Sequence, residues 1–185
     1  MNTDKFQISK MSILDKARNK VRLFVFKVKG LEIGEGAQIY QGNEIVNPKQ
    51  GKIGKRAKLY KNSTFYIGKK GSFVLGENSH IAPYGYLLID NNHIQIGENV
   101  AIGPFCTMIC HSNAIKGPSE LFCLNYEDGD ITIGNNVFIG AQCTILPGTI
   151  IHDNVVIASN SVVKGILESN TLYGGSPVKE IKKIE

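Results

Sequence analysis

The 185-residue chain contains no run of about 18 apolar residues, the length that a membrane-spanning helix needs. The start of the chain, Met1–Lys5, leads into no apolar stretch of the kind found in secretory signals, so we expect a cytoplasmic protein. The four cysteines match no zinc-ligand spacing, which favours reduced thiols, with Cys106 and Cys143 packed inside. No arginine–aromatic pattern accompanies the basic residues, so we expect no nucleic-acid partner.

Charge is spread unevenly along the chain. Residues 1–70 hold 16 lysines and arginines and five acidic residues, a net charge of +11, whereas residues 71–185 carry a net charge of −6. Such asymmetry is typical of a protein with an anionic neighbour, such as an acidic polysaccharide or a membrane. The alternatives are an ordinary solvated surface and a peripheral contact with the anionic inner membrane.

A six-residue repeat of aliphatic residues runs through most of the chain. A helix would scatter residues at this spacing around its axis, and a single strand of such length would exceed normal strands. A short strand followed by a tight turn, repeated, explains the period and sends one large side chain inward per unit. Small residues four positions after each aliphatic suit narrow corners, as at Ala57, Ser79 and Cys143.

Groups of three units repeat at intervals near 18 to 22 residues, which predicts about six stacked coils with three aliphatic walls. The first wall is Ile33, Ile53, Leu75, Ile96, Ile133 and Ile151. The second wall is Ile39, Leu59, Ile81, Ile102, Ile139 and Ile157. The third wall is Ile45, Phe65, Leu87, Met108, Ile145 and Val163.

The repeat divides the chain into an N-terminal helical segment (1–30), a β-helix (31–168) and a C-terminal cap (169–185). Residues 109–132 interrupt the repeat and predict one long loop, the kind of segment in which binding and catalysis concentrate. For the C-terminal cap we expect a short helix, with a strand as the alternative.

Residues 8–28 are predicted to form an amphipathic helix that starts at Ser9 or Ser12. We expect this helix to cap the open end of the coils or to pack against another subunit. A basic amphipathic helix that lies on an anionic membrane is the alternative. Its apolar residues at helical spacing are Met11, Leu14, Ala17, Val21, Phe24 and Val28.

The repeats resemble the hexapeptide-repeat acyltransferases, and most closely their maltose/galactoside and polysaccharide O-acetyltransferase branch. The resemblance is carried by the run Ile133–Ala141, the pair Pro147–Gly148, the stretch Ile157–Lys164 and the turn Gly174–Lys179. It implies an all-β fold, a left-handed parallel β-helix of triangular section. It also implies a homotrimer with active sites between subunits, and acetyl-CoA as co-substrate lying along the coils.

The same resemblance implies that His111, at the start of the long loop, is the general base. An ordinary imidazole titrates near neutral pH and can take a proton from a hydroxyl group. Such a base needs an acid to hold its tautomer, and we favour Glu127 among the loop acids. No second histidine follows closely, so we expect no metal. The loop acids are Glu120, Glu127, Asp128 and Asp130.

The resemblance also implies the residues that bind coenzyme A and the acceptor. Backbone groups near the coil edges would bind the pantetheine chain, and Lys164 and Lys179 would meet the nucleotide phosphates. The edge residues are Phe138, Gly140, Ala141, Ala158 and Ser159. For the acceptor, an asparagine common in this branch is missing, and the comparable stretch offers Tyr84, Tyr86 and Asp90 instead.

The sequence therefore predicts an acetyl-CoA-dependent O-acetyltransferase that acts on a sugar hydroxyl, in a precursor of a cell-surface polysaccharide. One alternative is an N-acetyltransferase that acts on an amino nucleotide-sugar with the same base and donor. From another class, the chain could be a non-catalytic β-helix that serves in assembly.

Overall fold

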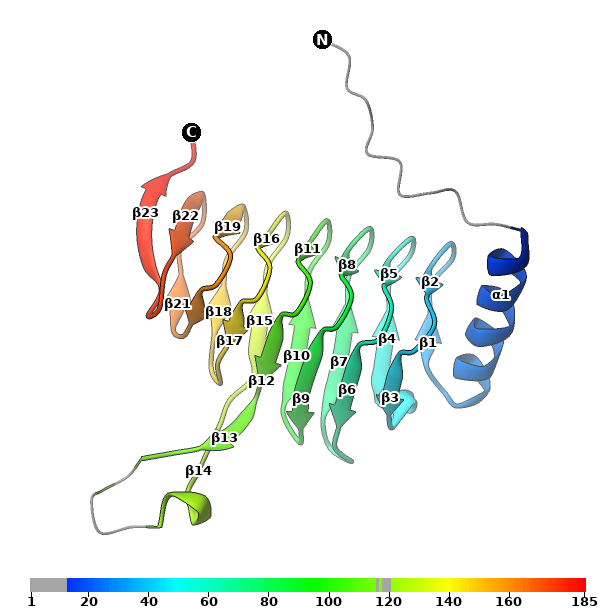
Figure 1. The fold of residues 1–185 in the computed structure, drawn as a ribbon, viewed down its shortest axis with the longest axis horizontal. Coiled ribbons are helices and arrows are strands. Elements are labelled where there is room, and N and C mark those ends of the chain that lie inside the picture. Colours follow the sequence, from blue (N-terminus) through cyan, green and yellow to red (C-terminus); the bar gives the residue numbers. More distant parts are fainter. Residues whose placement is uncertain (1–12, 116, 118–120) are drawn as a thin grey trace.

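The computed structural model describes residues 13–115, 117 and 121–185, which form a parallel β-solenoid of about six coils with one helix at its N-terminal end (Figure 1). Ser9, Met11, Ser12 and Glu120 lie outside the described residues. Short strands follow one another around a three-sided coil, and equivalent strands of successive coils pair in parallel. The predicted all-β solenoid is thus confirmed.

Each of the three faces is one sheet. Face 1 contains β1 (Glu32–Ile33), β4 (Gly51–Ile53), β7 (Ser72–Leu75), β10 (His93–Ile96), β15 (Ile131–Ile133), β18 (Ile150–Ile151) and β21 (Ile166–Leu167). Face 2 contains β2 (Gln38–Ile39), β5 (Lys58–Leu59), β8 (His80–Ile81), β11 (Ala101–Ile102), β16 (Phe138–Ile139), β19 (Val155–Ile157), β22 (Thr171–Gly174) and β23 (Lys179–Lys183). Face 3 contains β3 (Glu44–Val46), β6 (Thr64–Ile67), β9 (Tyr86–Asp90), β12 (Thr107–Ile109), β17 (Thr144–Ile145) and β20 (Val162–Val163).

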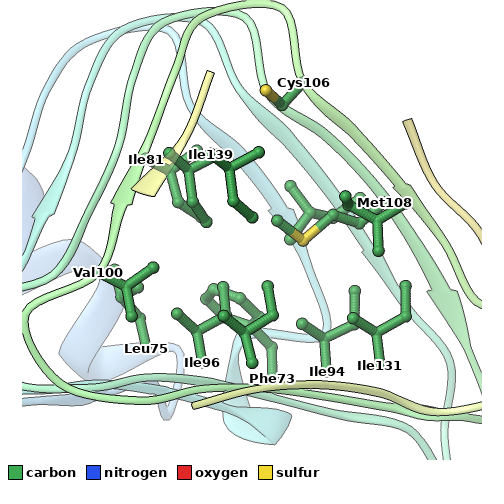
Figure 2. Close-up of a cluster of buried hydrophobic side chains, with 14 of the residues drawn as sticks. Phe73, Leu75, Ile81, Ile94, Ile96, Val100, Cys106, Met108, Ile131 and Ile139 are labelled. Carbon is green, nitrogen blue, oxygen red and sulfur yellow. The ribbon is translucent and has the colours of Figure 1, made fainter. Parts of the chain in front are cut away.

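The strand register reproduces the three predicted walls. Ile96 pairs with Ile133 on face 1, Ile102 with Ile139 on face 2, and Met108 with Ile145 on face 3. Figure 2 shows side chains from all three faces pointing into one continuous core. Burial of this aliphatic column is the main source of stability, because each coil covers the apolar face of the next.

Left-handed backbone at the corners is the feature that the aliphatic repeat does not predict. Asparagine occupies most of the positive-φ positions that are not glycine and, in one column, forms a ladder of side-chain hydrogen bonds from coil to coil. Asn136 bonds to Asn154 at 2.8 Å, and Asn154 bonds to Asn170 at 3.1 Å. Asparagine tolerates this conformation and also bonds its equivalent in the next coil, which explains its frequency here.

Close stacking at the corners explains why glycine occupies position 140, one of the positions predicted to bind coenzyme A. A Cβ added at Gly140 would lie 2.5 Å from the backbone nitrogen of Ser159 in the next coil. Only glycine therefore lets these two corners approach to this distance.

Helix α1 (Ile13–Val28) covers the N-terminal end of the solenoid (Figure 1). Phe26 is buried in the core, and Leu23 packs against it. Asn19 Oδ1 accepts a hydrogen bond from the Ile39 backbone N–H at 3.1 Å, and Arg22 donates to the Ile39 carbonyl at 2.6 Å. The helix thus satisfies the free edge of β2, which otherwise could pair with another chain.

The face that α1 uses for this contact differs from the predicted one. The apolar residues at helical spacing, from Leu14 to Val28, are exposed on the opposite side of the helix. The described helix is too short and too polar to cross a membrane.

The C-terminal cap is a strand, so the expected short helix is wrong. The coil continues beyond Lys164 through β21 and β22, and β23 then folds back antiparallel to β22. Backbone pairing with the exposed edge of β22 favours a strand over an isolated one-turn helix at this position.

The long interruption of the repeat leaves the solenoid as a β-hairpin. Its strands are β13 (His111–Asn113) and β14 (Tyr126–Asp128), which pair antiparallel, and η2 (Phe122–Leu124) precedes β14. All four cysteines are free, and Cys110 is buried beside the hairpin in addition to the expected Cys106 and Cys143.

Candidate functional site

The base of the hairpin places His111 beside Asp128. The antiparallel register sets these two residues directly opposite each other. His111 Nδ1 lies 2.9 Å from Asp128 Oδ1, and the imidazole stacks on Tyr126 with ring centroids 4.7 Å apart. With Nδ1 protonated and bonded to the carboxylate, Nε2 is left as a proton acceptor.

Asp128 is itself oriented by a second contact. Asn92 donates a hydrogen bond to the same carboxylate oxygen at 3.1 Å from the turn between β9 and β10. The hydrogen bonds from His111 and then Asn92 lower the pKa of Asp128, so its carboxyl stays ionised at neutral pH. An ionised acid fixed in this way can hold the imidazole orientation and stabilise its protonated form.

Asp128, and not Glu127, is therefore the partner of His111, which corrects the sequence-based preference. Side chains alternate along a strand, so neighbouring residues of β14 point to opposite sides. Glu127 points to the body of the solenoid, where both of its carboxylate oxygens contact Lys164 Nζ, at 2.7 and 2.8 Å. Lys164, expected to meet a nucleotide phosphate, instead ties the hairpin to the coils.

A pocket of about 580 Å³ opens in front of His111, at the corner between face 3 and face 1. We call this region the histidine corner. Its walls come from successive coils, because Val46, Tyr66 and Leu88 are register partners. Its polar lining residues are Asn47, Tyr66, Lys69, Asp90, Asn91 and His111.

Sequence reasoning missed Asn47, Tyr66, Lys69 and Asn91 as pocket residues. They come from three successive coils, and only the register between coils brings them together. The 20- to 22-residue spacing of the early coils could have indicated this pocket, because it aligns Val46 with Tyr66 and Leu88 in neighbouring coils.

Asp90 is the predicted acceptor residue that the structure brings to His111. A carboxylate oxygen of Asp90, a ring nitrogen of His111 and a carboxylate oxygen of Asp128 all lie within 4.8 Å of one another. Two carboxylates and an imidazole could hold a divalent cation weakly. Here the imidazole and one carboxylate are bonded to each other, which suits a general base and its orienting acid better.

The two predicted acceptor tyrosines occupy different places. Tyr86 lies on the outer surface of β9, and its ring contacts that of Tyr66, with centroids 6.0 Å apart, at the rim of the pocket. Tyr84 lies at the corner between faces 2 and 3, where it stacks on Phe105 with centroids 4.9 Å apart. Tyr86 is therefore near the histidine corner, whereas Tyr84 is not.

Most of the predicted coenzyme A residues lie at that second corner, away from His111. Gly140, Ala141, Ala158 and Ser159 follow β16 and β19 there, and we call this set the donor corner. Phe138 is half exposed on the outer surface of face 2, beside a second pocket of about 420 Å³. Lys179 lies opposite Gly174 in the C-terminal hairpin. Within one chain, the donor corner and the histidine corner therefore lie on opposite edges of face 3.

The chain is similar in sequence and structure to several known proteins. The family model for bacterial transferase hexapeptide (six repeats) matches residues 130–165. The solved structure of a mutant of AntD, an N-acyltransferase from Bacillus cereus, in complex with dTDP and coenzyme A, superposes with a TM-score of 0.76 at 25% identity, and the match covers 89% of both chains.

Two curated relatives are similar over shorter stretches. WbbJ of Escherichia coli, named for O-acetyl transfer in lipopolysaccharide biosynthesis, is 55% identical over 40 residues, which is 22% of this chain and 20% of WbbJ. The Saccharomyces cerevisiae protein YJL218W, named as an acetyltransferase, is 34% identical over 120 residues, 65% of this chain and 60% of that protein. The chain thus spans less than two thirds of either relative. Together these likenesses support a hexapeptide-repeat acetyltransferase.

Proposed function

We propose that this protein is an acetyl-CoA-dependent acetyltransferase with His111 as its general base. The contact that carries the proposal is the 2.9 Å hydrogen bond between His111 and Asp128 at the mouth of a pocket. A base, an orienting acid and a space for the reacting group are the parts that acyl transfer requires.

The reaction follows from this geometry. His111 Nε2 takes the proton of the acceptor hydroxyl as its oxygen attacks the thioester carbonyl, and a C–O bond forms. The tetrahedral intermediate then collapses, the C–S bond breaks, and the proton passes from Nε2 to the leaving thiolate. Asp128 holds the imidazole in place and stabilises its positive charge between the two steps. A backbone N–H from a facing coil would donate to the oxyanion.

We infer that the acceptor is a sugar and that the acetyl group goes to a hydroxyl, as in a precursor of a cell-surface polysaccharide. The pocket supports this by combining the ring of Tyr66 with amide and carboxylate groups, which suit sugar faces and hydroxyls. The likeness to WbbJ points in the same direction.

N-acetylation of an amino nucleotide-sugar is the second candidate, and the likeness to AntD favours it. In that case Lys69, which lines the pocket, would meet the acceptor phosphates, while Asp90 would bond the sugar amine or a neighbouring hydroxyl. The same base serves either nucleophile, so the choice rests on the acceptor side of the pocket.

We also propose that the working unit is a homotrimer. The histidine corner and the donor corner lie on opposite edges of face 3 in one chain, so a single chain does not assemble a complete site. A neighbouring copy that sets its donor corner against His111 would complete it. Such a trimer would work in the cytoplasm, where both acetyl-CoA and activated sugars are made.

The test is the release of coenzyme A from acetyl-CoA with a panel of hydroxy-sugar and amino-sugar acceptors. We expect acceptor-dependent release by the native protein and a loss of kcat on the order of 100- to 10,000-fold in His111→Ala. Equal release by both proteins would contradict catalysis by His111. If no acceptor in the panel supports release, although the protein binds coenzyme A, the result would favour the non-catalytic β-helix.

A further inference from the structure

Helix α1 carries an apolar face that is exposed in the part of the chain that the structure describes. Its packed face is formed by Asn19, Leu23 and Phe26, and Phe26 is only 8% exposed. At about 100° per residue, Leu14, Ala17, Val21, Phe24, Val25 and Val28 fall on the opposite side, within an arc of about 100°. Phe24 is 68% and Val28 is 72% exposed, far more than an ordinary core-facing position.

Basic side chains border this apolar face. On the same helical projection Lys16, Lys20 and Lys27 lie along one side of it, and Arg18 lies along the other. All four side chains are exposed. Lysine and arginine beside an apolar stripe can keep their charged ends at lipid headgroups while their methylene stems lie along the apolar layer.

The direction of the face follows from the fold. Because α1 lies across the N-terminal end of the solenoid, its outer face points away from the coils along the stacking direction (Figure 1). Lys49, which sits against Gly30 at the end of the helix, adds a further positive charge at that end. The outer face of α1 is therefore an apolar end surface of the described chain, bordered by basic side chains.

We propose that the outer face of α1 binds an anionic lipid membrane, with the coils standing end-on to it. Charge complementarity selects this partner. A second copy that used the same face would bring two rows of like charges together, whereas anionic headgroups neutralise them. The proposal concerns α1 alone and does not depend on the acetyl-transfer reaction.

The absence of tryptophan from the chain gives a direct test. Phe24→Trp places a single fluorescent reporter on the outer face, and Ile166→Trp places the matched control on an exposed position at the other end of the solenoid. With vesicles containing phosphatidylglycerol at low salt, we expect a blue shift of emission for Phe24→Trp and none for Ile166→Trp. No shift for Phe24→Trp, or an equal shift for both, would overturn the proposal.

A second pair of variants measures binding by co-sedimentation with the same vesicles. Phe24→Glu should weaken binding by about tenfold or more, and Ile166→Glu should leave it unchanged. Acceptor-dependent release of coenzyme A in solution should be unaffected by Phe24→Glu, which separates this claim from the proposed reaction. Failure of the native protein to sediment would overturn membrane binding. So would a smaller oligomer for Phe24→Glu, which would mark the face as a contact between copies.

Discussion

At the scale of single residues, the site depends on which side of a short strand each carboxylate occupies. Asp128 faces His111, whereas its neighbour Glu127 faces Lys164. A shift of β14 by one residue would exchange the two acids. The hairpin register is therefore part of the catalytic geometry that we propose.

Asp128→Asn should lower kcat on the order of 100-fold, because an amide can neither fix the required tautomer nor stabilise the imidazolium. Steady-state rates of the native protein and of Asp128→Asn, measured with the same acceptor, test this prediction.

Glu127→Gln is the matched control, one residue away in the same strand. It breaks an exposed ion pair with Lys164, and such pairs contribute little, so kcat should fall by less than about fivefold. A larger loss for Glu127→Gln than for Asp128→Asn would restore Glu127 as the partner of the base.

The sequence allowed His111 to be predicted but not its acid. His111 opens the only long interruption of the repeat, and the resemblance marks it. The choice between two adjacent acids depends on hairpin register, which two polar three-residue strands do not encode in any aliphatic pattern.

At the scale of elements, one aliphatic side chain per strand supports each coil. Ile151 of β18 is 1% exposed and points into the core, while its neighbour Ile150 is 38% exposed and points outward. Ile150 and Ile151 therefore allow the same substitution to be compared at an exposed and at a buried position of one strand.

Ile151→Ala should lower the free energy of unfolding by about 2–5 kcal/mol, since it leaves a cavity among paired aliphatic residues. Ile150→Ala should cost less than about 1 kcal/mol. Urea unfolding followed by circular dichroism measures both. Equal losses for the two variants would contradict the assignment of the inner and outer sides of face 1.

The aliphatic walls could be predicted to the residue, but the orientation of α1 could not. A six-residue period fixes which side chain points inward, because the coil has only one interior. Helical spacing shows that a helix has an apolar face without showing what covers it. Here polar Asn19 and Arg22 face the solenoid because the edge of β2 offers free backbone groups, and the apolar face points away.

At the scale of the whole molecule, the solenoid separates the two corners that the proposed reaction must combine. His111 and Asp90 occupy one edge of face 3, and Ala141 and Ser159 occupy the other. Stacking of the coils keeps these edges apart within one chain, and in the trimer that we propose a second copy brings its donor corner to the histidine corner. Resemblance to a trimeric family predicts this arrangement, and no periodicity within one chain could.

Mixing two inactive variants tests this shared site most directly. His111→Ala removes the base, and Ser159→Trp places a bulky ring over the donor corner, where Ser159 is exposed. Each variant alone should show little acceptor-dependent release of coenzyme A. After the two are co-refolded, mixed trimers should regain a substantial fraction of native activity, because some sites pair an intact histidine corner with an intact donor corner. If mixed oligomers form and remain inactive, the base and the donor site do not come from different subunits, which would contradict the shared site that we propose.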